Sequence, residues 1–305
     1  MNKTLKIILG PTAVGKTDYS IETALRYGSP VISCDSRQIY REMSVGTAVP
    51  SPEQLAAVKH YFIHSHTVTE LYTAGKYELE ALELINRLFA EGHDTLVMAG
   101  GSGFYVDALV NGLDDFPEAD LNLRSQLTVR LHDEGVESLR QDLLKLDPES
   151  YHTIDIANGQ RVVRALEVCL MTGRPFSSFK TSPKRKRDFE IEKIGLIRPR
   201  DVLYDRINRR VTQMIDDGLV EEVRSLTQYR SLSALKTVGY KEIFDWFDYL
   251  DGKVSTEGWG PTSPGDGPVT TLERAIELIQ RNTRHYAKRQ MSYWGRDKGI
   301  RWMEI

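Results

Sequence analysis

The sequence predicts an α/β fold in which helices flank a parallel sheet. Three short apolar runs, at residues 5–9, 31–34 and 95–99, each end in glycine or aspartate, and helix-compatible spacing follows at residues 19–27 and 105–109. Continuous apolar runs that alternate with helices are typical of strands buried on both faces of a parallel sheet. Because ligands bind at the carboxyl ends of such strands, we expect the three strand ends to form one site.

The composition is that of a globular protein with a sizeable core. The chain has 305 residues, of which 40% are hydrophobic and 27% charged, enough for one large domain or one domain with an insertion. No apolar window reaches 18 residues and no signal peptide precedes the first strand, so we expect a cytoplasmic protein without a membrane segment. The net charge of −3 means that any RNA site must be a local basic face. Cys34 and Cys169 have no paired motif and are predicted to be reduced, buried packing residues.

A change of pattern near residue 117 marks a second structural unit. Up to residue 186 the sequence indicates helices with acidic and leucine-rich faces, and strand character returns only at residues 191–197. We therefore predict a core formed by residues 1–116 and 188–305, with a helical insertion domain at residues 117–187.

The C-terminal part is predicted to contain two long helices. Their apolar spacing places them at about residues 202–227 and 272–294. Residues 255–268, between them, are rich in Gly, Pro, Ser and Thr, which is typical of a mobile surface loop. A basic run at residues 184–187 ends the insertion and is either a solvated turn or a contact with RNA phosphates.

Residues 10–17 read GPTAVGKT and match the phosphate-binding pattern G-x-x-x-x-G-K-[ST] between a strand and a helix. In such a P-loop the backbone amides and the helix N-terminus hold phosphate oxygens, Lys16 adds a positive charge, and the Thr17 hydroxyl can ligate Mg²⁺. The alternative is a glycine turn that only connects strand to helix. We predict a phosphate site at Gly10, Pro11, Thr12, Ala13, Val14, Gly15, Lys16 and Thr17.

Asp35, directly after the second apolar run, is a candidate general base. A P-loop NTPase holds its Mg²⁺ with an acid at the end of an apolar strand, but the run at residues 95–99 ends in Gly-Gly-Ser-Gly. A carboxylate at Asp35 could instead accept a proton from an incoming nucleophile. An aspartate that caps the following segment is the alternative.

Three histidines, His60, His64 and His66, suggest a metal site. No acidic or thiolate partner accompanies them, and residues 61–63 are typical of a strand in which histidines fill polar positions. We therefore favour the strand interpretation, and Mg²⁺ is the only metal that we predict.

Two predicted helices carry basic faces. Arg206 and Arg210 are spaced i, i+4 and so share one helix face. Residues 281–290 combine basic and aromatic side chains, a pattern that suits a phosphate backbone with exposed bases. For both helices the alternative is a solvated surface with scattered ion pairs.

Five further segments recur in one order along the chain: DSRQIYREMSVGTAVPS (35–51), GGSGFYVDALVNGL (100–113), RVVRALEV (161–168), TVGYKE (237–242) and TRHYAKRQ (283–290). Together with the P-loop they resemble the signature blocks of the tRNA dimethylallyltransferase family. The resemblance implies a P-loop core whose helical insertion closes on the tRNA anticodon arm. It also implies dimethylallyl diphosphate as donor, Mg²⁺ as cofactor, and transfer to N6 of the adenosine 3′ to the anticodon. We further expect a monomer.

The resemblance assigns roles by position. Asp35 is similar to the family's general base, and Lys16 and Thr17 to its ligands for diphosphate and Mg²⁺. Ser102 stands where the family commonly has threonine, Arg206 and Arg210 match arginines near the leaving diphosphate, and Val49 departs from a common lysine. Gln38 resembles the residue that reads the target base. The residues implied to contact tRNA are Ser36, Arg37, Gln38, Thr47, Arg161, Arg284, Lys288, Arg289 and Gln290.

Two other functions fit parts of the sequence. A P-loop kinase for a small molecule would use Asp35 as base and the two arginines, Arg206 and Arg210, as a lid. The missing acid after residues 95–99 and the basic helix at 281–290 disfavour it. An RNA-binding switch protein that changes shape with nucleotide is the other alternative.

Overall fold

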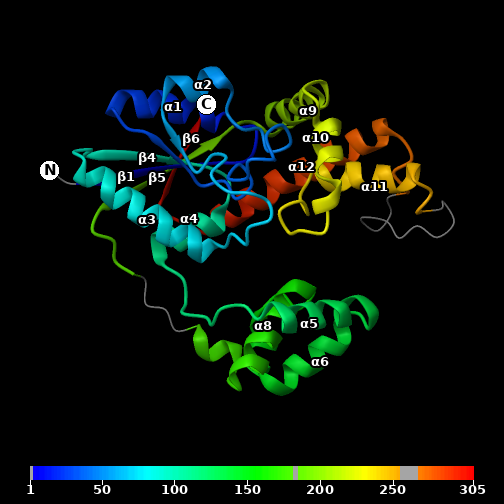
Figure 1. Cartoon of the computed structure of the whole chain (residues 1–305). Coiled ribbons are helices and arrows are strands. Elements are labelled where there is room, and N and C mark those ends of the chain that lie inside the picture. Colours follow the sequence, from blue (N-terminus) through cyan, green and yellow to red (C-terminus); the bar gives the residue numbers. More distant parts are fainter. Residues whose placement is uncertain (1–2, 181–184, 255–266) are drawn as a thin grey trace. The chain divides into compact units, whose positions relative to one another are not determined.

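The computed structural model describes residues 3–180, 185–254 and 267–305. The chain forms two compact units, one made of Met1–Val110 and Arg187–Ile305 and the other of Asn111–Lys186 (Figure 1). The second unit thus begins at residue 111 where the sequence suggested 117, and it ends at 186 where the sequence suggested 187.

The first unit contains a six-stranded sheet in the order β3-β2-β4-β1-β5-β6, and every strand pair among the described residues is parallel. The predicted parallel α/β fold is therefore confirmed. The edge strand β3 overlaps the strand favoured at residues 61–63 but ends at Tyr61, and the other edge strand, β6, was not among the predicted strands. The strands are β1 (Thr4–Leu9), β2 (Val31–Ser33), β3 (His60–Tyr61), β4 (Thr95–Ala99), β5 (Glu190–Ile197) and β6 (Ile300–Glu304).

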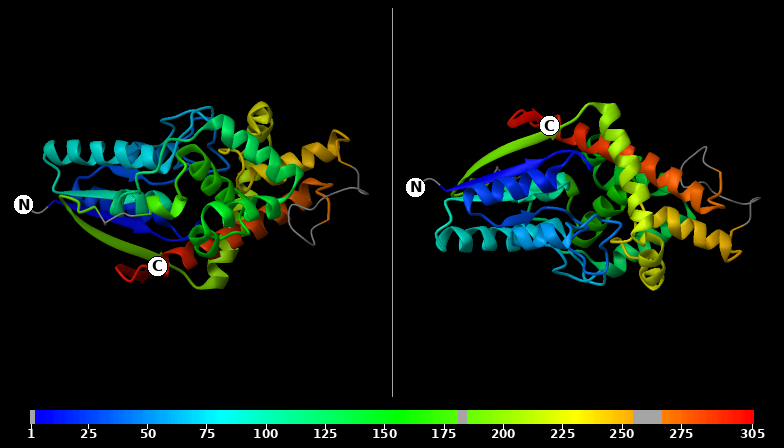
Figure 2. Two further views of the ribbon diagram at one scale, coloured as in Figure 1. Left: turned by 90° about the horizontal axis from the view of Figure 1, so that it is seen from below. Right: turned by 90° about the horizontal axis from the view of Figure 1, so that it is seen from above.

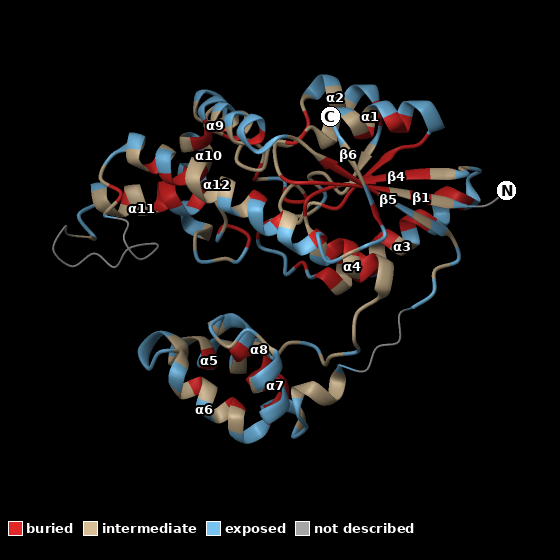
Figure 3. Ribbon diagram, turned by 180° about the vertical axis from the view of Figure 1, so that it is seen from behind, coloured by how far each residue is buried: buried red, intermediate tan, exposed pale blue. Residues whose placement is uncertain are grey.

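Helices cover both faces of this sheet, which explains why β1, β2 and β4 are largely apolar. In Figure 1, α1 (Lys16–Tyr27) and α2 (Pro52–Ala57) lie on one side, and α3 (Ala74–Ala90) and α4 (Gly103–Asn111) lie on the other. The two views of Figure 2 look onto these two sides. The buried central strands appear in red in Figure 3. Apolar side chains on both faces of a strand are the expected pattern for such a sheet.

The C-terminal part of the first unit is helical. The helices are α9 (Arg200–Asp216), α10 (Leu219–Ser225), α11 (Tyr240–Leu250) and α12 (Leu272–Trp294), with a short 3₁₀ turn at Thr227–Tyr229. The helix predicted at 272–294 is confirmed, but one continuous helix over 202–227 is wrong. The chain leaves the helix at Asp217, and Gly218 adopts a left-handed conformation with φ of 95°. Glycine tolerates this conformation and commonly ends a helix.

The second unit has a hydrophobic core of its own. It contains α5 (Leu121–Asp133), α6 (Val136–Leu146), α7 (Pro148–Thr153), α8 (Gly159–Thr172) and a 3₁₀ turn at Phe176–Phe179. Leucine and valine side chains of α5, α6 and α8 form the core, at Leu127, Leu139, Leu143, Val162, Val163 and Leu166. The buried Glu167 carboxylate is paired with Arg124 at 2.7 Å and with Arg164 at 3.0 Å, which compensates the cost of burying its charge.

Three further predictions concern single features. Cys34 and Cys169 are buried and unpaired, as expected. Within the described ranges no helix has both the length and the apolarity that a membrane span requires. Most of the predicted loop at 255–268, namely residues 255–266, lies outside the described residues. Lys184, the first residue of the predicted basic run, also lies outside them.

Candidate active site

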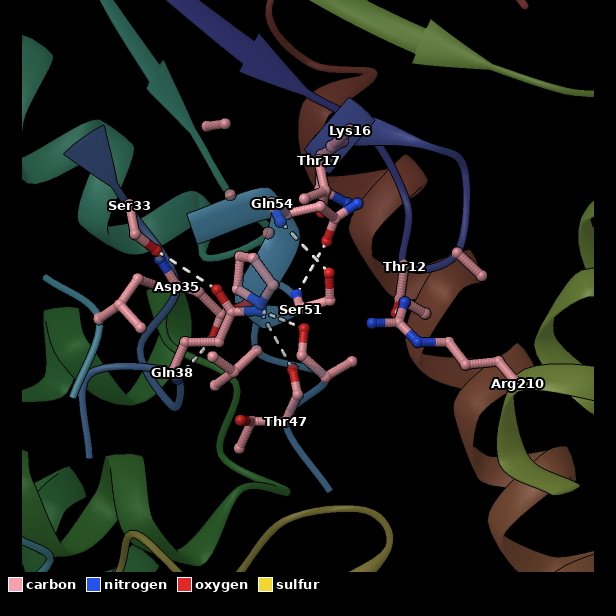
Figure 4. Close-up of a pocket in the computed structure, with 18 of the residues that line it drawn as sticks. Thr12, Lys16, Thr17, Ser33, Asp35, Gln38, Thr47, Ser51, Gln54 and Arg210 are labelled. Atoms are coloured by element: carbon pink, nitrogen blue, oxygen red, sulfur yellow. Dashed lines mark hydrogen bonds between the residues drawn. The ribbon is translucent and has the colours of Figure 1, made fainter. Parts of the chain in front are cut away.

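The carboxyl ends of β1, β2 and β4 meet at one cavity, as their neighbouring places in the sheet require. The cavity has a volume of about 890 Å³ and is lined by the P-loop, the segments after β2 and β4, and residues 44–55. Helices α9 and α12 close it from the C-terminal half of the chain. The predicted meeting of three strand ends is thus what the structure shows (Figure 4).

The P-loop conformation depends on two glycines. Gly10 and Gly15 have φ values of 147° and 115°, and a Cβ atom on Gly10 would lie 2.7 Å from the Leu196 carbonyl oxygen. Only glycine fits such a position without strain. Helix α1 then begins at Lys16, so its first amides point toward the loop.

The Lys16 ammonium group bends back over this loop. Its Nζ donates hydrogen bonds to the carbonyl oxygens of Gly10 and Pro11 at 2.9 and 2.8 Å. Burial, assisted by the nearby Arg210 charge, lowers the pKa of Lys16 to about 8, while the Asp35 carboxylate acts in the opposite direction. A bound phosphate group would stabilise the charged form of Lys16 and so raise its pKa.

Helix α9 brings two arginines to the same loop. Arg206 Nε donates to the Ala13 carbonyl oxygen at 2.8 Å, and Arg210 Nη1 lies 3.4 Å from Thr12 Oγ1. Within the described ranges neither arginine forms a salt bridge with a carboxylate, and burial lowers the pKa of Arg210. Two guanidinium groups with most of their donors unused therefore face a phosphate-binding loop, an arrangement suited to an anionic ligand.

The two carboxylate oxygens of Asp35 lie in different environments. Its Oδ1 accepts hydrogen bonds from the amides of Arg37 at 2.8 Å and Gln38 at 3.3 Å, so the residue does cap the segment that follows β2. The side chain also lines the cavity, and Oδ2 accepts no hydrogen bond within the described residues. One carboxylate oxygen therefore holds the loop and the other is available to a ligand.

Ser102 lies behind this segment and does not line the cavity. Its hydroxyl accepts a hydrogen bond from the Ser36 amide and donates one to Ser36 Oγ, each at 2.9 Å. Arg37 also turns away, and its guanidinium group donates to the Ser233 carbonyl oxygen at 3.2 Å. Ser102 and Arg37 thus hold the segment that follows β2. The resemblance implied instead that Ser102 lies near the diphosphate and that Arg37 contacts tRNA.

Gln38 does line the cavity, but part of its side chain is engaged by the protein. Its Nε2 donates to the carbonyl oxygens of Thr47 at 3.1 Å and Ala48 at 2.9 Å. Its Oε1 has one long contact, 3.5 Å, with Ser33 Oγ (Figure 4). The acceptor atom of the amide thus remains available.

The residues of α12 predicted to contact tRNA lie in different environments. Lys288 and Arg289 are exposed, whereas Arg284 Nη1 donates to Asn208 Oδ1 of α9 at 2.6 Å. Gln290 is buried. Its Oε1 accepts from the Thr12 amide and its Nε2 donates to the Gly101 carbonyl oxygen, each at 2.9 Å. Gln290 therefore ties the P-loop to the segment after β4, which differs from the surface contact suggested by the sequence.

Arg161 is exposed at the start of α8, in the second unit. The three histidines of the 60–66 segment make polar contacts with their own surroundings: His60 with the Val58 carbonyl oxygen, His64 with Ser44 Oγ and His66 with Ser65 Oγ. Among the described residues, no three histidine, cysteine or acidic side chains are grouped as metal ligands.

Two features near the site are not indicated by any pattern in the sequence. The Glu222 carboxylate of α10 accepts hydrogen bonds from the amides of Ser44, Val45 and Gly46 at 2.7–2.9 Å. A second cavity, of about 330 Å³, is lined by basic side chains including Lys241 and by Asp245, whose Oδ2 is buried without a hydrogen-bond partner in the described part of the chain. Burial, together with neighbouring Glu242, raises the pKa of Asp245 to about 6.

A family model described as IPP transferase matches residues 38–297. The chain belongs to the IPP transferase family. The match begins after the P-loop and Asp35 and covers the second unit and the C-terminal helices α9 to α12. It confirms the family resemblance based on the sequence segments.

Relatives and solved structures agree with this membership. The chain is 45% identical to a tRNA dimethylallyltransferase of Bacteroides thetaiotaomicron, over 98% of this chain and 91% of the relative. It is 44% identical to the tRNA dimethylallyltransferase of Christiangramia forsetii, over 100% of this chain and 94% of the relative. The crystal structure of a tRNA isopentenylpyrophosphate transferase from Bacillus halodurans has a TM-score of 0.67 at 35% identity, over 99% of this chain and 90% of that one.

A eukaryotic dimethylallyltransferase solved while acting on tRNA is also similar, with a TM-score of 0.76 over 99% of this chain and 74% of that one. Because the identity is only 23%, this similarity concerns the fold and nothing beyond it.

Proposed function

We propose that this protein transfers the dimethylallyl group of dimethylallyl diphosphate to N6 of the adenosine 3′-adjacent to the anticodon in tRNA, and releases diphosphate. The observation that carries the proposal is one cavity that combines a P-loop, the Asp35 carboxylate and two arginines that pair with no carboxylate in the described part of the chain, in a member of the IPP transferase family. The names of the relatives support tRNA as the acceptor.

The cationic side of the cavity suits the leaving group. When the bond between the allylic carbon and the diphosphate oxygen breaks, its electron pair goes to diphosphate and positive charge spreads over the prenyl group. Lys16, Arg206, Arg210 and the amides at the start of α1 lie together at the P-loop, which supports this loop as the site of that diphosphate. Preorganised donors of this kind stabilise a transition state without rearranging as charge develops.

Asp35 suits the acceptor. The adenine N6 amine is a weak nucleophile, because its lone pair is delocalised into the ring. As the bond from N6 to the allylic carbon forms, the amine must lose a proton, and Asp35 Oδ2 is the carboxylate oxygen that can accept it. The target base must leave the stack of the anticodon loop to reach this oxygen.

The residues present fit a Mg²⁺ ion held chiefly by the substrate. Thr17 lines the cavity at the start of α1, and Mg²⁺ in phosphate sites takes one or two protein oxygens together with phosphate oxygens and water. Thr17 would hold the ion, whose charge would help to neutralise the departing diphosphate.

The tRNA is expected to contact exposed basic residues in both units. Lys288 and Arg289 lie on the surface of α12 in the unit that holds the cavity, and Arg161 lies on the surface of α8 in the insertion. We propose that the insertion closes on the anticodon arm and that the protein acts as a cytoplasmic monomer. Phosphate contacts of this kind position RNA and make its binding dependent on salt.

The direct test is to incubate the protein with labelled dimethylallyl diphosphate, Mg²⁺ and unmodified tRNA, and to analyse the nucleosides after digestion. Label on N6 of the adenosine next to the anticodon is expected, and a tRNA with guanosine at that position should remain unlabelled. Absence of label from the adenosine tRNA would refute the proposal.

Ligand-induced stabilisation separates the proposal from the kinase alternative. A ligand at 100 times its dissociation constant adds about 2.7 kcal/mol to the free energy of unfolding. Dimethylallyl diphosphate should raise the unfolding temperature in this way, and the protein should transfer no phosphate from ATP to any small acceptor.

A further inference from the structure

The Glu222 carboxylate of α10 accepts four hydrogen bonds, three of them from one loop. Its Oε2 accepts from the amides of Ser44 at 2.8 Å and Val45 at 2.7 Å, and its Oε1 accepts from the Gly46 amide at 2.9 Å. The hydroxyl of Tyr240, on α11, donates to the same Oε1 at 2.6 Å. Hydrogen bonds to an ionised acceptor are about twice as strong as neutral ones, so this one side chain fixes three consecutive backbone units.

Tyr240 packs beneath the same loop. Its side chain is fully buried, and a Cβ atom on Gly46 would lie 2.6 Å from the ring. Burial and the adjacent Glu222 carboxylate raise the pKa of the Tyr240 hydroxyl, which therefore stays protonated and can donate its hydrogen bond. Glu222 of α10 thus holds the loop through hydrogen bonds, and Tyr240 of α11 holds it through packing.

The anchored loop continues into the residues that hold Gln38. The Ala48 amide donates to the Val45 carbonyl oxygen at 3.0 Å, and Ala48 has a left-handed conformation with φ of 51°. A residue with a side chain adopts this conformation only when its surroundings impose it. The resulting turn directs the carbonyl oxygens of Thr47 and Ala48 to Gln38 Nε2.

This contact decides which end of the Gln38 amide faces the cavity. Carbonyl oxygens only accept hydrogen bonds, so the NH₂ group of Gln38 must point to the loop and its Oε1 must remain on the cavity side. Asp35 Oδ2 is also an acceptor. The adenine N6 amine carries two hydrogens and can donate one to Gln38 Oε1 and one to Asp35 Oδ2. The O6 atom of guanine is itself an acceptor and would be repelled by both oxygens.

We propose that Glu222 is a positioning residue for target-base selection, which acts through residues 44–48 to fix the orientation of the Gln38 amide. The proposal rests on the proposed function, because it concerns the choice of the base that receives the prenyl group. Glu222 does not line the cavity and is not a catalytic residue. Its loss should therefore change the choice of base more than the binding of the donor.

Glu222→Gln tests this role with little change of shape, because it replaces one acceptor oxygen by an NH₂ group that repels the loop amides. We would measure the affinity for anticodon arms that carry adenosine or guanosine at the target position. The preference for adenosine should fall about tenfold, the scale of one lost polar contact to a base. The affinity for dimethylallyl diphosphate should stay within about twofold, since within the described residues the hydrogen bonds of Arg206 and Arg210 go to the P-loop and not to residues 44–48.

Two further variants make the result specific. Glu221→Gln removes the same charge from the adjacent, exposed position of α10, where the side chain makes no hydrogen bond or salt bridge in the described part of the structure, and should leave the preference unchanged. Tyr240→Phe removes one of the four hydrogen bonds to Glu222 and should reduce the preference about threefold, in the same direction.

The double variant Gln38→Ala/Glu222→Gln decides whether Glu222 acts through Gln38. If it does, adding Glu222→Gln to Gln38→Ala should cause no further loss of preference. An unchanged preference in Glu222→Gln, or losses that add in full in the double variant, would overturn the inference while leaving prenyl transfer intact. A wild-type protein that modifies no tRNA would instead refute the proposed function.

Discussion

Gln290 links two parts of the candidate site, and its replacement by methionine separates a structural role from contact with RNA. The side chain bridges the Thr12 amide and the Gly101 carbonyl oxygen, and it is almost completely buried. Methionine has a similar volume and shape but forms neither hydrogen bond, so Gln290→Met removes the two contacts without creating a cavity.

The expected loss follows from the two groups left behind. Each buried polar group without a partner costs about 1–3 kcal/mol, and the Thr12 amide is only partly buried, so the free energy of unfolding should fall by about 2–4 kcal/mol. Donor affinity should fall as well, since the Thr12 amide belongs to the P-loop. Affinity for tRNA should change by less than about twofold, because the side chain is buried at the cavity wall and is not part of the exposed basic surface proposed to contact RNA phosphates.

Tryptophan fluorescence during denaturant unfolding reports on the relevant part of the chain, because all four tryptophans lie outside residues 111–186. Gln228→Met is the matched control, since Gln228 is exposed in the same unit and its side chain makes no hydrogen bond within the described residues. A change below about 0.5 kcal/mol in Gln290→Met, together with a tenfold loss of tRNA affinity, would refute the structural role and restore the RNA contact.

Three other predictions address the chemistry and the RNA surface. Asp35→Asn should bind donor and tRNA normally but lose about 10²- to 10⁴-fold in single-turnover rate, and a rate within tenfold of wild type would exclude the base role. Because the pKa of Lys16 is lowered to about 8 and bound diphosphate favours its charged form, donor affinity should fall by up to about tenfold per pH unit above pH 8. Lys16→Ala should bind more weakly and lack this dependence in titrations across pH. Lys288→Gln should weaken tRNA binding equally for all sequences and reduce the slope of affinity against salt by about one, whereas an unchanged slope would place the phosphate contacts elsewhere.

The parts of the site that the sequence predicts are those in which one short segment carries the signal. Residues 10–17 and Asp35 each follow an apolar run directly, and the rule that parallel strands end at one edge of the sheet was enough to bring them together. The arginines of α9 could be placed on one helix face by their spacing, but the contact of Arg206 with Ala13 depends on how α9 packs.

Other features depend on contacts between distant segments, which local patterns do not record. Nothing in the sequence near Glu222 indicates that its carboxylate binds the amides of residues 44–46. Gln290 did have a local signal. Ala287, Gln290 and Trp294 are all buried on one face of α12, at the i, i+3 and i+7 spacing of a core-facing stripe, although the surrounding basic residues suggested RNA.

The break between α9 and α10 could also have been recognised from its residues. Gly218 interrupts an otherwise helical pattern, and the structure uses it to end one helix and begin another. Apolar residues with helical spacing continue on both sides of Gly218, and this favoured one long helix. In the structure these residues are all buried: Leu203, Ile207, Val211, Leu219 and Val223.

Because β1 lies between β4 and β5, the growing chain completes its sheet late during synthesis. A ribosome releases β4 before it has made the Asn111–Lys186 unit, and β5 emerges only afterwards. At a synthesis rate of about 5–20 residues per second, the interval lasts roughly 5–20 s. Throughout it one edge of β1 has no partner strand, and unpaired edges promote association between chains. The length of the insertion therefore sets how long the incomplete sheet of the nascent chain must be protected from aggregation.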